Sequence, residues 1–120
     1  MKTAIAYLRT ARIDEGNIDP RINQEKIIRD FCKKSQTELL QVFTDVCSGM
    51  TNFNGKSWLD LENYILHNDV DYILVSDLDR LGRNYNVVRE KIKSFENKGK
   101  TLIHAILYNP ASDLETYPSL

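Results

Sequence analysis

Short apolar runs of strand length alternate along the chain with segments in which apolar residues recur every three or four positions. The runs predict four strands, and a run that is apolar at nearly every position is typical of a parallel sheet covered on both faces. The predicted strands are Thr3–Leu8, Leu39–Val46, Asp71–Ser76 and Thr101–Leu107.

Three helices are predicted between these strands from the helical spacing of apolar residues. The first extends from Asn23 to Lys34, after a polar segment that reaches about Ile22. Ser57 is predicted to cap the second helix, and the third begins near Asn84 and stops at Gly99. The inner faces carry Ile27, Ile28, Phe31 and Cys32; Trp58, Leu61 and Ile65; and Val88, Ile92 and Phe95.

This alternation predicts one α/β domain with a mostly parallel central sheet of four to five strands and helices on both faces. The length of 120 residues fits a single domain. No apolar stretch approaches the roughly 18–20 residues that span a bilayer, and the N-terminal segment lacks a secretory pattern. We therefore expect a cytoplasmic protein without a membrane partner.

Polar side chains follow three of the predicted strands, after Leu8, Val46 and Ser76. In parallel sheets these carboxyl ends lie at one edge, where ligands bind. The side chains that we expect there are Arg9, Arg12, Ser48, Lys56, Asp77, Asp79, Arg80 and Arg83.

The formal net charge of −1 hides an uneven distribution of charge. Residues 59–79 contain six acids and no Lys or Arg, whereas residues 80–100 contain seven Lys or Arg and two acids. Residues 1–12 add three basic side chains and no acid. Two positive stretches can therefore meet an anion locally.

Arg80 and Arg83 lie three residues apart at a strand-to-helix junction, so both guanidinium groups can point to one side. Arginine suits phosphate because its planar fork donates two parallel hydrogen bonds and keeps its charge. The alternative is a surface turn in which aspartates and arginines pair. Arg9 favours the phosphate site, because three converging arginines repel unless an anion or carboxylates lie between them.

Asp77 and Asp79 form a D-x-D pair, which also suggests a magnesium site. The pair is similar to the one in Toprim domains, but no acid ends the first strand here and Arg80 follows the pair directly. A haloacid-dehalogenase-like site would carry its D-x-D on the first strand. We therefore expect no metal, and we expect Asp79 to orient an arginine.

The segments "YLRTA" (Tyr7–Ala11), "DVCSG" (Asp45–Gly49) and "DLDRLGR" (Asp77–Arg83) resemble the three signature blocks of the serine recombinase catalytic domain. That family's pattern reads Y-x-R-V-S, a Gln on the first helix, D-x-x-S-G and D-R-L-G-R. Gln24 is well placed for the glutamine, and the match extends over essentially the whole chain in order.

The resemblance implies DNA breakage and rejoining through a 5′-phosphoserine link, without a metal or another cofactor. It implies dimers and tetramers of recombinase subunits on DNA. Arg9, Arg80 and Arg83 would hold the scissile phosphate, and Gln24 and Asp79 would orient them. Tyr7, Ser48, Lys56 and Arg12 would bind or support that phosphate.

Two residues depart from the family pattern. Ala11 occupies the position of the nucleophilic serine and has no hydroxyl, and Lys56 stands where the family has an arginine. Thr10 is adjacent, but neighbouring side chains on an extended segment point opposite ways. We therefore expect a domain that binds a DNA phosphate but is defective in strand cleavage by the family mechanism.

The sequence ends before the long oligomerisation helix and the DNA-binding module of such recombinases, so we expect a fragment of a longer recombinase or a truncated relative. A non-enzymatic module that pairs with an active recombinase is the main alternative. A Toprim-like or flavodoxin-like domain that binds a nucleotide or metal is a further one.

Overall fold

The computed structural model describes residues 1–47 and 53–107 of the chain. Four strands form one sheet in the order β2-β1-β3-β4, and every neighbouring pair is parallel. The elements are β1 (Thr3–Thr10), α1 (Pro20–Ser35), β2 (Glu38–Val46), α2 (Lys56–His67), β3 (Tyr72–Val75), the 3₁₀ helix η2 (Leu78–Arg80), α3 (Tyr85–Lys98) and β4 (Leu102–Ala105).

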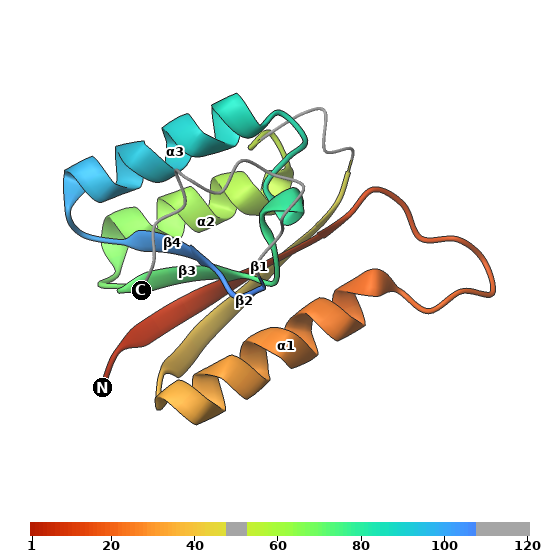
Figure 1. Cartoon of the computed structure of the whole chain (residues 1–120), viewed down its shortest axis with the longest axis horizontal. Helices are drawn as coiled ribbons and strands as arrows, with labels where there is room; N and C mark the ends of the chain where they lie inside the picture. Colours follow the sequence, from red (N-terminus) through yellow and green to blue (C-terminus); the bar gives the residue numbers. More distant parts are fainter. Residues whose placement is uncertain (48–52, 108–120) are drawn as a thin grey trace.

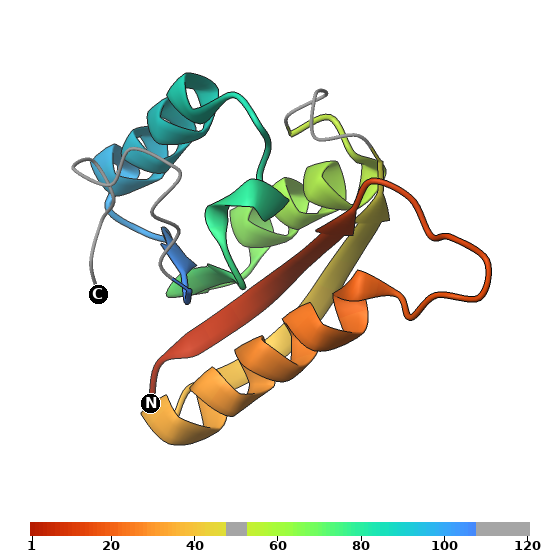
Figure 2. The ribbon, with the colours of Figure 1, turned by 45° about the vertical axis from the view of Figure 1, so that its right-hand side comes forward.

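Helices cover both faces of the sheet, as predicted. Helices α2 and α3 lie together on one face, and α1 lies on the other (Figure 1). The turned view in Figure 2 shows α1 alongside β1 and β2, with α2 and α3 across the sheet. The loop between β1 and α1 projects from this body on the right of both views.

The central strand β1 supplies residues to two cores because its side chains alternate between the faces of the sheet. Ile5 and Tyr7 join the larger core with Trp58 beneath α2 and α3. On the other face, Ala4, Ala6 and Leu8 pack with Ile28 and Cys32 of α1.

The predicted start of the first helix at Asn23 is wrong, because α1 begins three residues earlier at Pro20. The Asp19 carboxylate caps the helix by accepting a hydrogen bond from the backbone N–H of Arg21 at 3.0 Å. Proline suits the first helical position because it has no N–H to leave unpaired there. The start signal was present in the sequence, one turn before the apolar period.

The predicted cap of the second helix is also wrong. The N-cap is Gly55, and Ser57 lies inside α2. The backbone N–H groups of Ser57 and Trp58 instead donate to the Asp45 carboxylate, at 2.9 and 3.0 Å. The capping carboxylate belongs to β2, so the sequence around Ser57 could not predict it.

The third helix agrees with its prediction at both ends. Asn84 caps α3 with its side-chain oxygen, and Gly99 ends it in the left-handed conformation with φ of 68°. The sequence pattern did not predict η2, which links β3 to α3 and carries Asp79 and Arg80. No helix in the described ranges is long and apolar enough to cross a membrane.

Candidate phosphate-binding site

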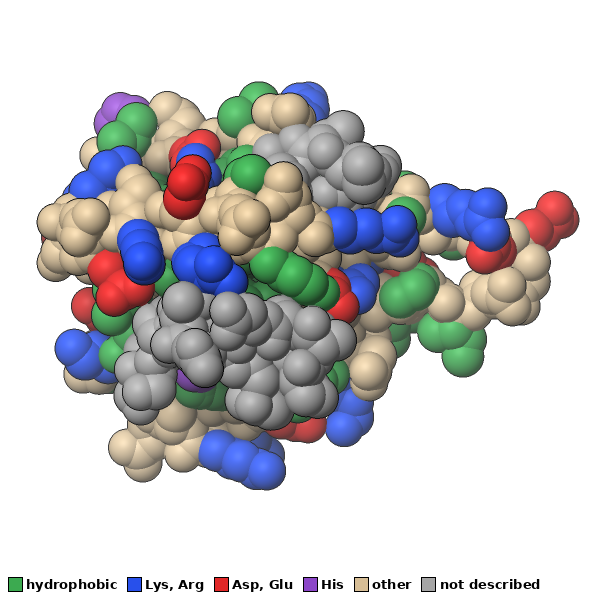
Figure 3. All heavy atoms as spheres, turned by 45° about the horizontal axis from the view of Figure 1, so that its top comes forward, with side chains coloured by type: hydrophobic (Ala, Val, Ile, Leu, Met, Phe, Trp, Pro, Cys, Tyr) green, Lys and Arg blue, Asp and Glu red, His purple; other side chains and the backbone are tan. Residues whose placement is uncertain are grey.

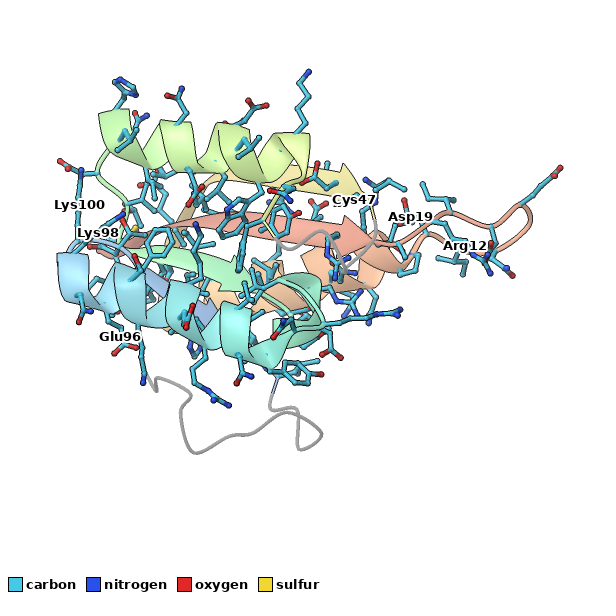
Figure 4. The ribbon with its side chains drawn as sticks, turned by 90° about the horizontal axis from the view of Figure 1, so that it is seen from above. Arg12, Asp19, Cys47, Glu96, Lys98 and Lys100 are labelled. Atoms are coloured by element: carbon cyan, nitrogen blue, oxygen red, sulfur yellow. The ribbon has the colours of Figure 1, made fainter. Side chains whose placement is uncertain are left out.

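The carboxyl ends of β1, β2 and β3 meet at one edge of the sheet. Figure 4 shows Arg12, Asp19 and Cys47 at this edge, and Lys98 and Lys100 at the opposite end of the molecule. The pairing register aligns Arg9 of β1 with Asp45 of β2, and η2 follows directly after β3. Three separate chain segments thus contribute side chains to one place.

Arg9 ties these segments together through its guanidinium group. Its Nε donates to the carbonyl of Arg80 at 2.7 Å, and its Nη1 donates to the carbonyl of Cys47 at 3.0 Å. Its Nη2 donates to the carbonyl of Asp79. These bonds use three of the five N–H donors of the group. Arg9 is only 7% exposed, so it has a structural task in addition to any ligand it binds.

Gln24 fixes the backbone of Arg9 from the first helix. Its Oε1 accepts from the Arg9 N–H at 3.0 Å, and its Nε2 donates to the Arg9 carbonyl at 2.9 Å. Gln24 is buried, so the pair forms away from water. The glutamine therefore reaches Arg9 through the main chain rather than through the guanidinium.

Arg80 and Arg83 flank the turn between η2 and α3. Arg80 donates from Nη1 to the Arg9 carbonyl at 3.1 Å and from Nε to Asp77 Oδ1 at 3.2 Å. Arg83 is exposed. Gly82 between them has φ of 147°, a conformation that a residue with a Cβ rarely adopts.

The three arginines meet at a cavity of about 360 Å³. The described residues that line it are Arg9, Ala11, Asp79, Arg80, Arg83 and Tyr85. Burial lowers the pKa of the Arg9 guanidinium, and the positive charges of Arg80 and Arg83 lower it further. Like charges held this close favour an anion between them. The spatial convergence predicted for these arginines is thus present.

The two aspartates of the D-x-D pair have different partners. Asp77 pairs with Arg80, whereas Asp79 Oδ1 accepts a hydrogen bond from the Tyr85 hydroxyl at 2.6 Å. Pairing between Asp77 and an arginine was expected only in the surface-turn alternative, and Tyr85 was not predicted as a cavity residue. Among the described residues, no three His, Cys, Asp or Glu side chains are grouped so that they could hold a metal.

Tyr7 lies beneath the site rather than on the cavity wall. Its hydroxyl donates to Asp45 Oδ2 at 2.7 Å, and its ring packs edge-on against Trp58 with centroids 5.0 Å apart. Burial raises the pKa of the Tyr7 hydroxyl, and its hydrogen bond to Asp45 raises it further. Tyr7 therefore supports the end of β1 as a neutral buried donor.

The remaining predicted residues lie around the cavity or outside the described residues. Arg12 is exposed on the projecting loop and pairs with Asp14 at 3.0 Å. Lys56 is exposed at the first position of α2. Neither belongs to the cavity lining, and Ser48 lies outside the described residues. Figure 3 shows Lys and Arg side chains on the surface beside the projecting loop.

Comparison with solved structures identifies the fold. The chain is similar to the C-terminal catalytic domain of ISC1926 TnpA, an IS607-like serine recombinase, with a TM-score of 0.75, 20% identity, and 90% of this chain and 69% of that one covered. It is similar to the N-terminal catalytic domain of TP901-1 integrase, with a TM-score of 0.72, 22% identity, and 88% and 77% covered.

A resolvase family site-specific recombinase from Streptococcus pneumoniae is also similar, with a TM-score of 0.70, 15% identity, and 88% and 72% of the two chains covered. The curated proteins contain no match to the sequence. The family model described as "Resolvase, N terminal domain" matches residues 4–113. With its fold and the order of its motifs, the chain therefore belongs to the resolvase N-terminal domain family of serine recombinases.

Proposed function

We propose that this domain binds a DNA phosphate through Arg9, Arg80 and Arg83, and that it is defective in strand cleavage by the family mechanism. The observation that carries the proposal is the cavity in which the three arginines meet, with Ala11 on its wall. An arginine cluster of this kind stabilises the charge of a phosphoryl group undergoing transfer. Ala11 occupies the place from which a hydroxyl would attack.

The electrostatics favour an anion as the ligand. Arg80 is partly neutralised by Asp77, while Arg83 is exposed on the rim. A phosphate that bridges the three side chains would relieve their mutual repulsion. The partners that we propose are therefore the DNA backbone and, in a longer form, other recombinase subunits.

Lys56 adds a second limit on cleavage. It stands where the family pattern has an arginine, and an ammonium group offers charge without the bidentate fork of a guanidinium. Its position at the first turn of α2 lets it approach DNA from the surface. We assign it a supporting contact only.

The test restores the missing hydroxyl. We expect Ala11→Ser, placed in the longest available form of the protein, to form a covalent protein–DNA adduct on a cognate site, stable to denaturing electrophoresis and carried by the new residue. The same protein with Ala11→Gly should give no adduct at residue 11. Absence of the adduct despite salt-sensitive DNA binding would show that Ala11 is not the only residue that prevents strand cleavage.

A non-catalytic role in recombinase assembly is the second candidate, and the missing hydroxyl at residue 11 favours it. Such a module would pair with an active recombinase subunit and alter its assembly. Co-purification with that subunit, unchanged in an Arg80→Ala, Arg83→Ala double variant, would support this role over phosphate binding.

A further inference from the structure

Among the residues that the structure describes, the wall of this cavity carries a hydroxyl group that does not belong to a serine. Of the six described side chains on its wall, only Tyr85 carries a hydroxyl. Thr10 does not line the cavity, and its hydroxyl donates to the Arg12 carbonyl at 3.2 Å. The phenol therefore shares a cavity with the three guanidinium groups.

The phenol of Tyr85 is hydrogen-bonded to the carboxylate of Asp79. A hydrogen bond of this kind joins a nucleophile to its general base. The phenol oxygen lies 2.6 Å from Asp79 Oδ1. Asp79 in turn is held at its main chain by the buried Arg9 guanidinium. A nucleophile, a base within hydrogen-bond reach and a group that orients the base are the parts that covalent catalysis needs.

We propose that Tyr85 is a nucleophile toward phosphodiesters in this cavity, with Asp79 as its base. The proposal rests on the phosphate site proposed above and goes beyond it, because it assigns to this chain a phosphotyrosyl reaction independent of residue 11. Tyrosine is among the residues that form covalent enzyme intermediates.

The step is a transesterification that needs no cofactor or redox partner. The Tyr85 oxygen forms a bond to phosphorus while its proton moves to the Asp79 carboxylate. The bond from phosphorus to the leaving oxygen breaks, and that oxygen takes a proton, supplied through solvent as Asp79 loses its own. The products are a phosphotyrosyl diester and a free hydroxyl group. The arginines stabilise the charge on the phosphoryl oxygens.

The test uses thymidine 5′-(4-nitrophenyl phosphate), whose leaving group departs as an anion and needs no protonation. We expect a burst of 4-nitrophenolate that approaches the amount of protein, and a thymidylyl adduct on the tryptic fragment Asn84–Arg89, in which Tyr85 is the only tyrosine. Tyr85→Phe should abolish the adduct, and Asp79→Asn should slow it by about 100-fold.

Tyr64→Phe is the matched control, because Tyr64 of α2 packs against Phe43 of β2 and is absent from the cavity wall. Its adduct should equal that of the unaltered protein. Competition between the reagent and a fluorescent DNA duplex measures occupancy of the site separately.

The outcomes distinguish the two proposals. If the reagent displaces DNA but leaves no adduct on Tyr85, or if the adduct survives Tyr85→Phe, the nucleophile assignment is wrong while the phosphate site stands. If neither DNA nor the reagent binds in a salt-sensitive way, the phosphate site itself is wrong.

Discussion

The Asp45 carboxylate, buried at the end of β2, joins β1 to the first turn of α2. It accepts hydrogen bonds from the Tyr7 hydroxyl and from the N–H groups of Ser57 and Trp58. A Cβ at Gly55 would lie 2.2 Å from Asp45 Oδ2, closer than atoms approach without a shift. At the level of single residues, the start of α2 therefore depends on one carboxylate and on the absence of one methyl group.

We expect Gly55→Ala to lower the free energy of unfolding by about 2 kcal/mol, since the new methyl must displace a buried carboxylate. Gly55 has φ of −62°, so the loss comes from the contact and not from backbone strain. Urea denaturation followed by the fluorescence of Trp58 measures the change. In an Asp45→Ala background the added loss should be much smaller, because close residues couple. An equal loss in both backgrounds would refute this account.

At the level of elements, the apolar period located all three helices because each has one face buried against the sheet. Capping residues were informative where they are close in sequence to the helix that they cap. Asn84 and Gly99 mark the two ends of α3. Asp19 and Pro20 mark the start of α1, although its apolar period begins later. The start of α2 could not be predicted, because its cap comes from another element. The 3₁₀ helix η2 is only three residues long, so it has no apolar period from which it could have been predicted.

Helix α1 and strand β4 touch through Phe31 and His104, whose ring centroids are 5.3 Å apart. Burial lowers the pKa of His104 below its usual 6.5, because the charged imidazolium is disfavoured in the fold. A lowered pKa in the folded state means that the unfolded chain binds the proton more readily. This contribution to stability is therefore complete above about pH 6.5 and declines as the pH falls below it.

We expect the urea concentration at the midpoint of unfolding to decrease as the pH is lowered from about 8 to about 5. The decrease should be smaller in His104→Gln, which keeps a polar side chain but cannot titrate. Measuring both proteins across the range separates His104 from the carboxylates that also titrate in acid. Identical pH profiles for the two proteins would show that His104 contributes nothing.

At the level of the whole molecule, parallel strands bring Arg9 together with Arg80 and Arg83 from 71 and 74 positions away. This convergence could be predicted, because the carboxyl ends of parallel strands share an edge. The partners within the site could not. Asp77 pairs with Arg80, and Asp79 accepts a hydrogen bond from Tyr85, and neither contact follows from the order of the strands.

We expect DNA binding to weaken with salt, with a slope of log K against log salt of about −1 if the three arginines share one phosphate. Arg83→Ala should weaken binding by about tenfold at low salt, because one of the three guanidinium contacts to that phosphate is lost. Lys98→Ala is the control, because Lys98 lies at the opposite end of the molecule (Figure 4). Titrations by fluorescence anisotropy at several salt concentrations measure both. A DNA affinity unaffected by Arg83→Ala would place DNA elsewhere on the surface.

The three carbonyl bonds of Arg9 have a consequence for the evolution of the domain. Selection for a foldable chain and selection for chemistry act on the same guanidinium. A descendant that lost DNA chemistry would still need arginine at this position, because its guanidinium joins the segments that follow β2 and β3. The survival of Arg9 in a relative is thus no sign of surviving activity, whereas the exposed Arg83 is free to change once the chemistry is gone.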